Sequence, residues 1–178
     1  MNRFQIHVAK SPEEMARISS FFLSPESFDD THHTPGEIEH FQKRPLQSLE
    51  DEHSYYWYVQ DEAGGVIAVI SFLQNDHRTG GYILEYVVVH REYRKAGLAS
   101  QILDDMIQFI SSIKGRYIET FTCDLEEYAS IRRLFDRKGF ARVGVQPDYY
   151  FPGEGKLLYY KMLQPPQIPE KGEAEAHI

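Results

Sequence analysis

Apolar and polar positions change their spacing several times along the chain, and each spacing predicts a different kind of element. Apolar residues three and four positions apart predict amphipathic helices, whereas alternating or short continuous apolar runs predict strands. Helical spacing begins at Pro12, Pro35 and Leu98, and again after Asp124-Leu125-Glu126-Glu127, a segment that is predicted to cap the last helix. Strands are predicted over residues 3–9, 55–60, 66–73, 82–89, 117–123, 140–145 and 156–163.

The first two predicted helices carry strong start signals. Ser11 and Glu14 have the spacing of a capping box, with proline at the first helical position. Thr34 and Glu37 repeat the same arrangement. Because proline cannot donate a backbone hydrogen bond inside a helix, Pro45 is predicted to end the second one.

Residues 82–113 form the stretch around which the other elements are arranged. Its strand, 82–89, is almost continuously apolar, which predicts burial on both faces, and residues 98–113 follow helical spacing. Residues 94–99, which lead from the strand into the helix, include small residues and no acid. Unpaired N–H groups and the dipole of a helix N-terminus favour an anion, and Gly97 lets a phosphate approach the backbone. The stretch therefore predicts a phosphate site, although the glycine patterns of P-loops and Rossmann folds are absent.

Two segments resemble signatures of the GNAT acetyltransferase superfamily. Arg94-x-x-Gly97-x-Ala99 is similar to that family's R/Q-x-x-G-x-G/A loop, and the preceding VVVHREYR resembles its L-x-V-x-P-E-Y-R segment. Residues 123–140 resemble its N-x-x-A-x-x-L-Y-E-K-x-G-F segment. The order of predicted elements over residues 3–163 is also similar to that of the family.

The resemblance implies an α+β fold of three layers, α/β/α, with a mixed, mostly antiparallel sheet and a splayed central strand. Residues 1–163 would form this N-acetyltransferase domain, and the proline-rich, charged residues 164–178 have the composition of a disordered tail. The resemblance also implies acetyl-CoA as acyl donor, a primary amine as acceptor, no metal and a possible homodimer. The positions expected to bind the coenzyme are Val87, Val88, Val89, Arg94, Lys95, Ala96, Gly97, Leu98, Ala99, Ser100 and Tyr128.

Glu85 is predicted to be the general base, because it lies where some family members place a catalytic glutamate. Its apolar neighbours imply burial, which raises the pKa of a carboxyl group. A raised pKa would suit Glu85 to deprotonate an ammonium group, directly or through water. Two alternatives stay open: Glu85 could pair with a basic neighbour, or it could only bind the charge of the substrate.

The general acid is less clear, because the chain departs from the family pattern at two positions. Phe135 stands where many members have the tyrosine that protonates the departing thiolate, and a phenyl ring has no proton to give. Tyr128 stands where an asparagine is common. Tyr149 and Tyr150 are the predicted catalytic replacements, with Tyr150 slightly favoured. Tyr128 and the absence of any acid remain alternatives.

Other chemically suggestive residues have simpler interpretations. Cys123 is expected to be a buried small side chain rather than a nucleophile. The aromatic residues 55–58 lack basic surroundings, so packing is favoured over nucleic-acid stacking. Arg132 and Arg133 could reach phosphates, but a solvated helix face is favoured. The histidine pair at 32–33 lacks further ligands at a recognised spacing, so no metal is predicted.

Composition limits the functional class further. The 178 residues fit one domain, and the net charge of −8 argues against a nucleic-acid surface while suiting a cationic substrate. One cysteine, no apolar run near ~20 residues and no signal peptide predict a cytoplasmic protein without disulfides or a membrane span. A small cationic amine is favoured as acceptor over a protein N-terminus or lysine. A catalytically silent acyl-CoA-binding module remains the alternative to an enzyme.

Overall fold

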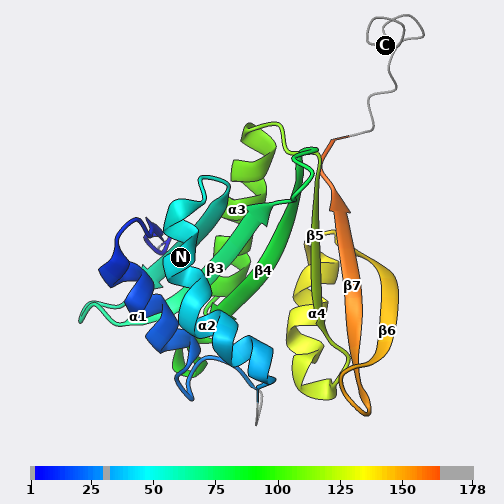
Figure 1. The fold of residues 1–178 in the computed structure, drawn as a ribbon, viewed down its shortest axis with the longest axis horizontal. Helices are drawn as coiled ribbons and strands as arrows, with labels where there is room; N and C mark the ends of the chain where they lie inside the picture. Colours follow the sequence, from blue (N-terminus) through cyan, green and yellow to red (C-terminus); the bar gives the residue numbers. More distant parts are fainter. Residues whose placement is uncertain (1–2, 30–32, 165–178) are drawn as a thin grey trace, which may run out of the picture.

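A single mixed sheet runs through the part of the chain that the computed structural model describes, residues 3–29 and 33–164. The predicted tail, except Gln164, and His32 lie outside these residues. The strands are arranged in the order β1-β2-β3-β4-β5-β7-β6 (Figure 1). They are β1 (His7–Val8), β2 (Ser54–Gln60), β3 (Val66–Gln74), β4 (Gly81–Val89), β5 (Tyr117–Cys123), β6 (Ala141–Phe151) and β7 (Glu154–Met162). The helices are α1 (Pro12–Phe22), α2 (Pro35–Gln47), α3 (Leu98–Ser112) and α4 (Ala129–Arg137), with short 3₁₀ turns η1 (Ser48–Glu50), η2 (Arg91–Tyr93) and η3 (Glu126–Tyr128).

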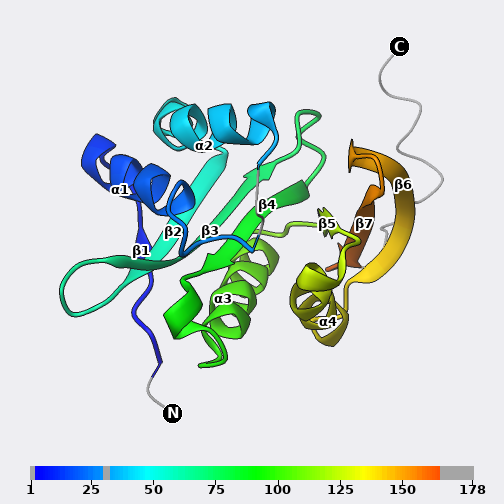
Figure 2. The same cartoon turned by 90° about the horizontal axis from the view of Figure 1, so that it is seen from below.

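Helices cover both faces of this sheet. α1 and α2 lie on one face of β1–β4, and α3 and α4 lie on the other side (Figure 2). The core under α1 and α2 includes Phe22, Phe41 and Tyr56, each nearly inaccessible to solvent. The core under α3 and α4 includes Ile102 and Phe135. The three-layer prediction is confirmed.

The sheet splits at its centre, between β4 and β5. All neighbouring strands pair antiparallel except these two, which run parallel. Their ladder extends only from Gly81 to Ile83 on β4, opposite Tyr117 to Glu119 on β5. Beyond these residues the two strands diverge, as Figure 1 shows. The predicted splayed central strand is therefore confirmed, and the divergence positions the candidate site.

Capping boxes start α1 and α2 as the sequence predicts. The Glu14 N–H donates to the Ser11 hydroxyl at 3.2 Å, and the Ser11 N–H donates to the Glu14 carboxylate at 3.0 Å. Thr34 and Glu37 form the same reciprocal pair, at 3.2 and 2.8 Å. Both helix starts therefore satisfy their exposed N–H groups with their own side chains.

Two predicted boundaries near the N-terminus were wrong. α2 continues through Pro45 to Gln47, because a proline in the last turn removes only one helical hydrogen bond and its ring is buried. The first strand contains only His7–Val8. The backbone of Phe4 is instead held by the side chain of Gln101, which accepts from its N–H at 2.9 Å and donates to its carbonyl at 2.8 Å.

Two later elements also differ from the prediction. β6 continues beyond residue 145, but its pairing with β7 is interrupted after Gln146 and resumes only at Phe151. Asp124 does not cap α4; its carboxylate accepts a hydrogen bond from the Gly155 N–H at 2.8 Å, which ties the end of β5 to β7. α4 begins instead from the η3 turn, without a side-chain cap.

Candidate active site

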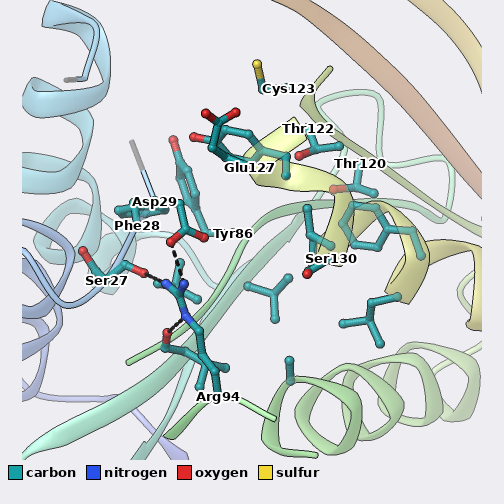
Figure 3. A pocket seen from close by; sticks show the side chains of 18 of the residues that line it. Ser27, Phe28, Asp29, Tyr86, Arg94, Thr120, Thr122, Cys123, Glu127 and Ser130 are labelled. Atoms are coloured by element: carbon teal, nitrogen blue, oxygen red, sulfur yellow. Dashed lines mark hydrogen bonds and ion pairs between the residues drawn. The ribbon is translucent and has the colours of Figure 1, made fainter. Parts of the chain in front are cut away.

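The divergence of β4 and β5 opens a cavity of about 720 Å³. Its walls come from the connection between α1 and α2, the start of α2, β4, the loop before α3, the end of β5, α4 and the turn between β6 and β7. Figure 3 shows polar side chains from several of these segments around one space. Every predicted coenzyme-binding position except Ala96 lines the cavity, and so do Glu85 and Tyr150. Tyr149 does not.

The N-terminus of α3 forms one wall of the cavity without satisfying its own N–H groups. Gly97 occupies the N-cap position in the left-handed conformation, with φ of 82°, which other residues adopt only at a cost. No side chain accepts from the first turn, and the first turn contains no acidic residue. The N–H groups and the positive end of the helix dipole are therefore left for an anionic ligand.

Arg94 holds the cavity wall together through three protein contacts. Its guanidinium donates to the Val89 carbonyl at 3.1 Å, to the Ser27 carbonyl at 2.8 Å and to Asp29 at 2.6 Å (Figure 3). Arg91 supports the same connection by donating to the Phe28 carbonyl at 2.7 Å. Arg94, a predicted coenzyme ligand, thus joins the loop before α3 to the connection between α1 and α2.

Basic side chains on α4 face the same cavity. Arg133 and Arg137 line it, four residues apart and therefore on one face of the helix. Arg132 points elsewhere, because its guanidinium donates to the carbonyls of Cys123 and Leu125. Sequence reasoning missed Arg137, although its spacing from Arg133 was a usable signal.

Glu85 lies at a bulge in β4. Ser71 of β3 pairs with Tyr86, but the next residue of β3 pairs with Leu84, so Glu85 has no partner in the ladder. The bulge turns both Glu85 and Tyr86 toward α2, where His40 Nε2 lies 3.8 Å from the Glu85 carboxylate. A strictly alternating strand would have placed the two side chains on opposite faces.

The Glu85 carboxyl is largely buried, and one of its oxygens has no hydrogen-bond partner in the protein. Its side chain is 14% exposed, and its Oε2 atom is buried without a hydrogen-bond partner. Burial raises the pKa of this carboxyl; Arg44 opposes the rise, and Asp51 adds to it. A carboxylate in this environment gains by taking up a proton, as a general base must.

Tyr150 lines the cavity from the part of β6 that lies outside the β6–β7 ladder. Pairing between these strands is interrupted from Gln146 to Phe151. Burial, followed by the charge of Glu37, raises the pKa of Tyr150 well above its usual value. Its hydroxyl therefore stays protonated at neutral pH. Tyr149 is 52% exposed, and its ring lies 4.3 Å from the ammonium of Lys156.

The other candidates for the acid have different surroundings. Tyr128 is half-buried at the N-cap of α4 and lines the cavity. Phe135 is 2% exposed and packs against Phe140 and Tyr159, so its ring serves the core as well as the cavity wall. Burial raises the pKa of the Cys123 thiol, which makes this residue a poor nucleophile.

Aromatic and acidic side chains form the end of the cavity beside α2. Phe28 and Tyr86 line it, with ring centroids 6.0 Å apart. Glu37 also lines it, while its carboxylate caps α2. Sequence reasoning recognised Glu37 only as a cap, because nothing local indicates that the start of α2 faces β4.

Within residues 3–29 and 33–164, no group of three or more His, Cys, Asp or Glu side chains is arranged to hold a metal ion. In the same described residues, no helix combines the length and apolar character needed to cross a membrane.

The sequence matches a family model described as the acetyltransferase (GNAT) family over residues 15–140. The chain therefore belongs to the GNAT acetyltransferase family. No match was found among curated proteins.

Solved structures share the fold at low sequence identity. A protein of Desulfovibrio desulfuricans described as a GNAT-family acetyltransferase has a TM-score of 0.76 at 18% identity, covering 91% of this chain and 100% of that one. An aminoglycoside 6'-N-acetyltransferase complexed with coenzyme A has a TM-score of 0.71 at 16% identity, covering 92% and 99%. The ribosomal-protein-S18-alanine N-acetyltransferase of Escherichia coli has a TM-score of 0.70 at 10% identity, covering 93% and 98%. At these identities the similarity establishes the fold and leaves the substrate open.

Proposed function

We propose that this protein transfers the acetyl group of acetyl-CoA to the primary amine of a small cationic acceptor. The observation that carries the proposal is the distribution of charge along one cavity. The uncapped start of α3 and the side chains of Lys95, Arg133 and Arg137 provide positive potential. Glu85 and Glu37 provide negative potential near α2, and Glu127 on η3 and Glu154 on β7 add further negative charge to the lining.

The α3 end fits the diphosphate of a coenzyme. Its first-turn N–H groups have no side-chain acceptor, and Gly97 removes the Cβ atom that would keep a phosphate from the backbone. When bound, acetyl-CoA supplies the activated thioester carbonyl. Val89 and Glu85 are four residues apart on β4, roughly 13 Å at about 3.3 Å per residue. The strand could therefore guide a pantetheine arm from the α3 end toward the carboxylate.

Glu85 would act as the base. An acceptor amine arrives as an ammonium ion and must lose a proton before its lone pair can attack a carbonyl carbon. The Glu85 carboxylate lines the cavity, and its buried Oε2 atom has no competing protein donor. Its raised pKa keeps the proton once it is taken. The Glu85 carboxyl must then release this proton before the next turnover.

Tyr150 would stabilise the leaving thiolate by donating a hydrogen bond. Its raised pKa keeps the hydroxyl protonated, so the donor is always available. The same rise makes complete proton transfer to a thiolate with pKa of about 8.5 energetically uphill. Tyr150 is thus better suited to stabilising negative charge than to serving as a strong acid. This role compensates for the phenyl ring at Phe135.

The end of the cavity beside α2, which would hold the acceptor, favours an amine that carries a further positive charge. Phe28 and Tyr86 line this end with aromatic rings, a side-chain type that attracts cations, and Glu37 adds a carboxylate to the same lining. Glu37→Gln should preserve the capping box, because glutamine also fits its N3 position, while removing the charge. We expect this variant to raise KM for a diamine about tenfold and to leave KM for a monoamine unchanged.

One observation favours a second candidate, a silent acyl-CoA-binding module. Phe135 lines the cavity with a phenyl ring, which has no proton to donate to a thiolate. Thiol release from acetyl-CoA, measured over a panel of diamines, amino sugars, amino acids and peptides, separates the two functions. Turnover with a small cationic amine supports the enzyme. Tight binding of acetyl-CoA without thiol release from any amine would favour the module.

A further inference from the structure

A second polar region lies behind Glu85, on the side away from the cavity. Tyr56, Ser71 and Tyr86 stand opposite one another on β2, β3 and β4, so their side chains share the face that α2 covers. Glu85 is the bulged residue beside this row, and His40 approaches it from α2 at 3.8 Å. We call His40, Tyr56, Ser71 and Glu85 the polar cluster.

Every member of the polar cluster contributes a buried polar atom; those of His40 and Glu85 have no hydrogen-bond partner in the protein, whereas the Tyr56 and Ser71 hydroxyls lie within reach of each other. These atoms are His40 Nε2, the Tyr56 hydroxyl, Ser71 Oγ and Glu85 Oε2. Tyr56 and Ser71 are 1% and 0% exposed, so bulk solvent cannot reach them. An unsatisfied buried polar group costs about 1–3 kcal/mol, and a buried water typically bonds to about three such groups. Two such groups and two hydroxyls in one place therefore favour an internal water bound among them.

The cluster connects the cavity with the outer surface of α2. Glu85 lines the cavity, whereas the other three members do not. The side chain of His40 is 29% exposed although its Nε2 atom is buried, so one edge of the ring faces Glu85 and another edge reaches solvent. An imidazole in this position can take a proton on one nitrogen and release one from the other.

We propose that the polar cluster is the route by which the proton removed from the acceptor amine reaches solvent, with His40 as its outer member. The inference rests on the function proposed above, in which Glu85 is the base. The ammonium gives one proton to Glu85. The carboxyl gives it to the neutral imidazole of His40, directly or through water bonded to Tyr56 and Ser71. The imidazolium then releases a proton to bulk solvent, and both side chains return to their starting charge.

The electrostatics of His40 favour the release of the proton to solvent, whereas its uptake from Glu85 is the less favourable step. Burial, followed by the charge of Arg44, lowers the pKa of His40, and Glu37 opposes this effect. The ring is therefore neutral at pH 7 and gives up a proton readily once it has received one. The groups that act on Glu85 or His40 are Glu37 and Arg44 on α2, Asp51 after η1, Tyr56 on β2 and Tyr86 on β4.

The first test needs no acceptor. NMR titration of the His40 ring in wild type should give a two-step curve, because strongly interacting groups titrate as a pair. Glu85→Gln should reduce it to one step. Glu39→Gln, which changes an exposed carboxylate next to His40 in sequence, should leave the two-step curve intact. Identical His40 curves in wild type and Glu85→Gln would overturn the route.

The second test uses thiol release with an amine that the panel identifies. His40→Ala should lower kcat about tenfold, since a positioned proton-transfer group contributes at least this much. Free imidazole in the buffer should restore most of the loss by filling the vacated space. His7→Ala removes another half-buried histidine and should show neither the loss nor the rescue. A loss in His40→Ala that imidazole cannot restore would assign His40 a structural role and overturn the route. If no amine gives turnover, the proposed function fails, while the NMR titration still decides whether His40 and Glu85 are coupled.

Discussion

α3 begins differently from α1 and α2. A helix begins with N–H groups that have no partner inside the helix. α1 and α2 satisfy theirs with capping boxes, through Ser11 and Glu14 and through Thr34 and Glu37. α3 has Gly97 at its N-cap, no capping side chain and no acid in its first turn. The starts of α2 and α3 both line the cavity, but of these two only the start of α3 leaves its N–H groups open to a ligand.

Two glutamates on the same side of the sheet show the same contrast. The Glu14 carboxylate accepts from the Lys10 and Ser11 N–H groups and from the Tyr58 hydroxyl, at 2.9, 3.0 and 2.9 Å. The hydrogen bond from Lys10 is the main reason that the pKa of Glu14 is lowered. Glu85 has a partnerless oxygen and a raised pKa. Satisfied groups contribute stability, whereas the unsatisfied ones lie where a ligand or a proton would be received.

The largest effect is expected from Glu85→Gln, which removes the proposed base but keeps its shape. We expect kcat to fall by roughly 10²–10⁴, the usual contribution of general base catalysis, while acetyl-CoA binds as before. Thiol release and calorimetric titration measure the two quantities. Unchanged kcat would leave Glu85 as a binding group only.

Glu85→Gln should lower kcat but raise the stability of the folded state at alkaline pH. Because the pKa of Glu85 is raised in the folded state, that state keeps a proton which the unfolded chain loses above the usual value of 4.5. Wild-type stability therefore falls as pH rises from 4.5 through the folded pKa. Glu85→Gln should unfold at higher urea concentration than wild type at pH 8, and the difference should vanish near pH 4.

The next largest effect, a loss of about a hundredfold in coenzyme affinity, should follow when an acidic side chain is placed in the first turn of α3. Ser100 occupies the position in α3 that Glu14 occupies in α1, the third residue after the N-cap. Ser100→Glu would place a carboxylate at the N–H groups that are proposed to bind a diphosphate. The helix should become more stable by about 0.3–1 kcal/mol, because an acid favours a helix N-terminus.

The control for this change is Ser100→Gln, which has the same size without the charge. Calorimetric titration with acetyl-CoA should show weak binding to Ser100→Glu and binding to Ser100→Gln within about threefold of wild type. Equal losses in both variants would attribute the effect to side-chain volume and would argue against an anion site at α3.

Tyr150→Phe should have a smaller effect, a fall of about tenfold in kcat with little change in KM. One hydrogen bond to developing negative charge is lost, and hydrogen bonds to charged groups contribute about 1.5–3 kcal/mol. Tyr149→Phe is the matched comparison, because its ring is half-exposed and does not line the cavity. It should change kcat less than twofold. The reverse ranking in the thiol-release assay would assign the role to Tyr149.

Local sequence signals predicted most of this fold. The capping boxes at Ser11 and Thr34 and the loop at Gly97 depend on neighbours within a few residues, so their patterns could be recognised directly. Tyr117–Cys123 was predicted at its observed bounds for the same reason. The prediction that Pro45 ends α2 was wrong, because the free-energy cost of proline depends on how close it lies to the end of the helix. The sequence around Pro45 does not specify where the helix ends.

The long-range part of the site could not be predicted in this way. A bulge at Glu85 depends on the register between β3 and β4, which the sequence of β4 alone does not specify. The approach of His40 to Glu85 depends in turn on that bulge and on the position of α2. The roles of the predicted site residues therefore stay predictions, and the variants above test them one at a time.

The smallest effect is expected from removing the N-cap side chains of α1 and α2, which should lower stability. Ser11→Ala and Thr34→Ala each remove a side-chain acceptor at a helix start, and each should cost about 1 kcal/mol of unfolding free energy. Because these caps lie on separate helices, the double variant should lose about the sum. Urea unfolding measures these losses, and calorimetry should find acetyl-CoA affinity unchanged in Ser11→Ala. A weakened affinity in Ser11→Ala would mean that the packing of α1 is coupled to the coenzyme end of the cavity, and the division between satisfied and open helix starts would then be too simple.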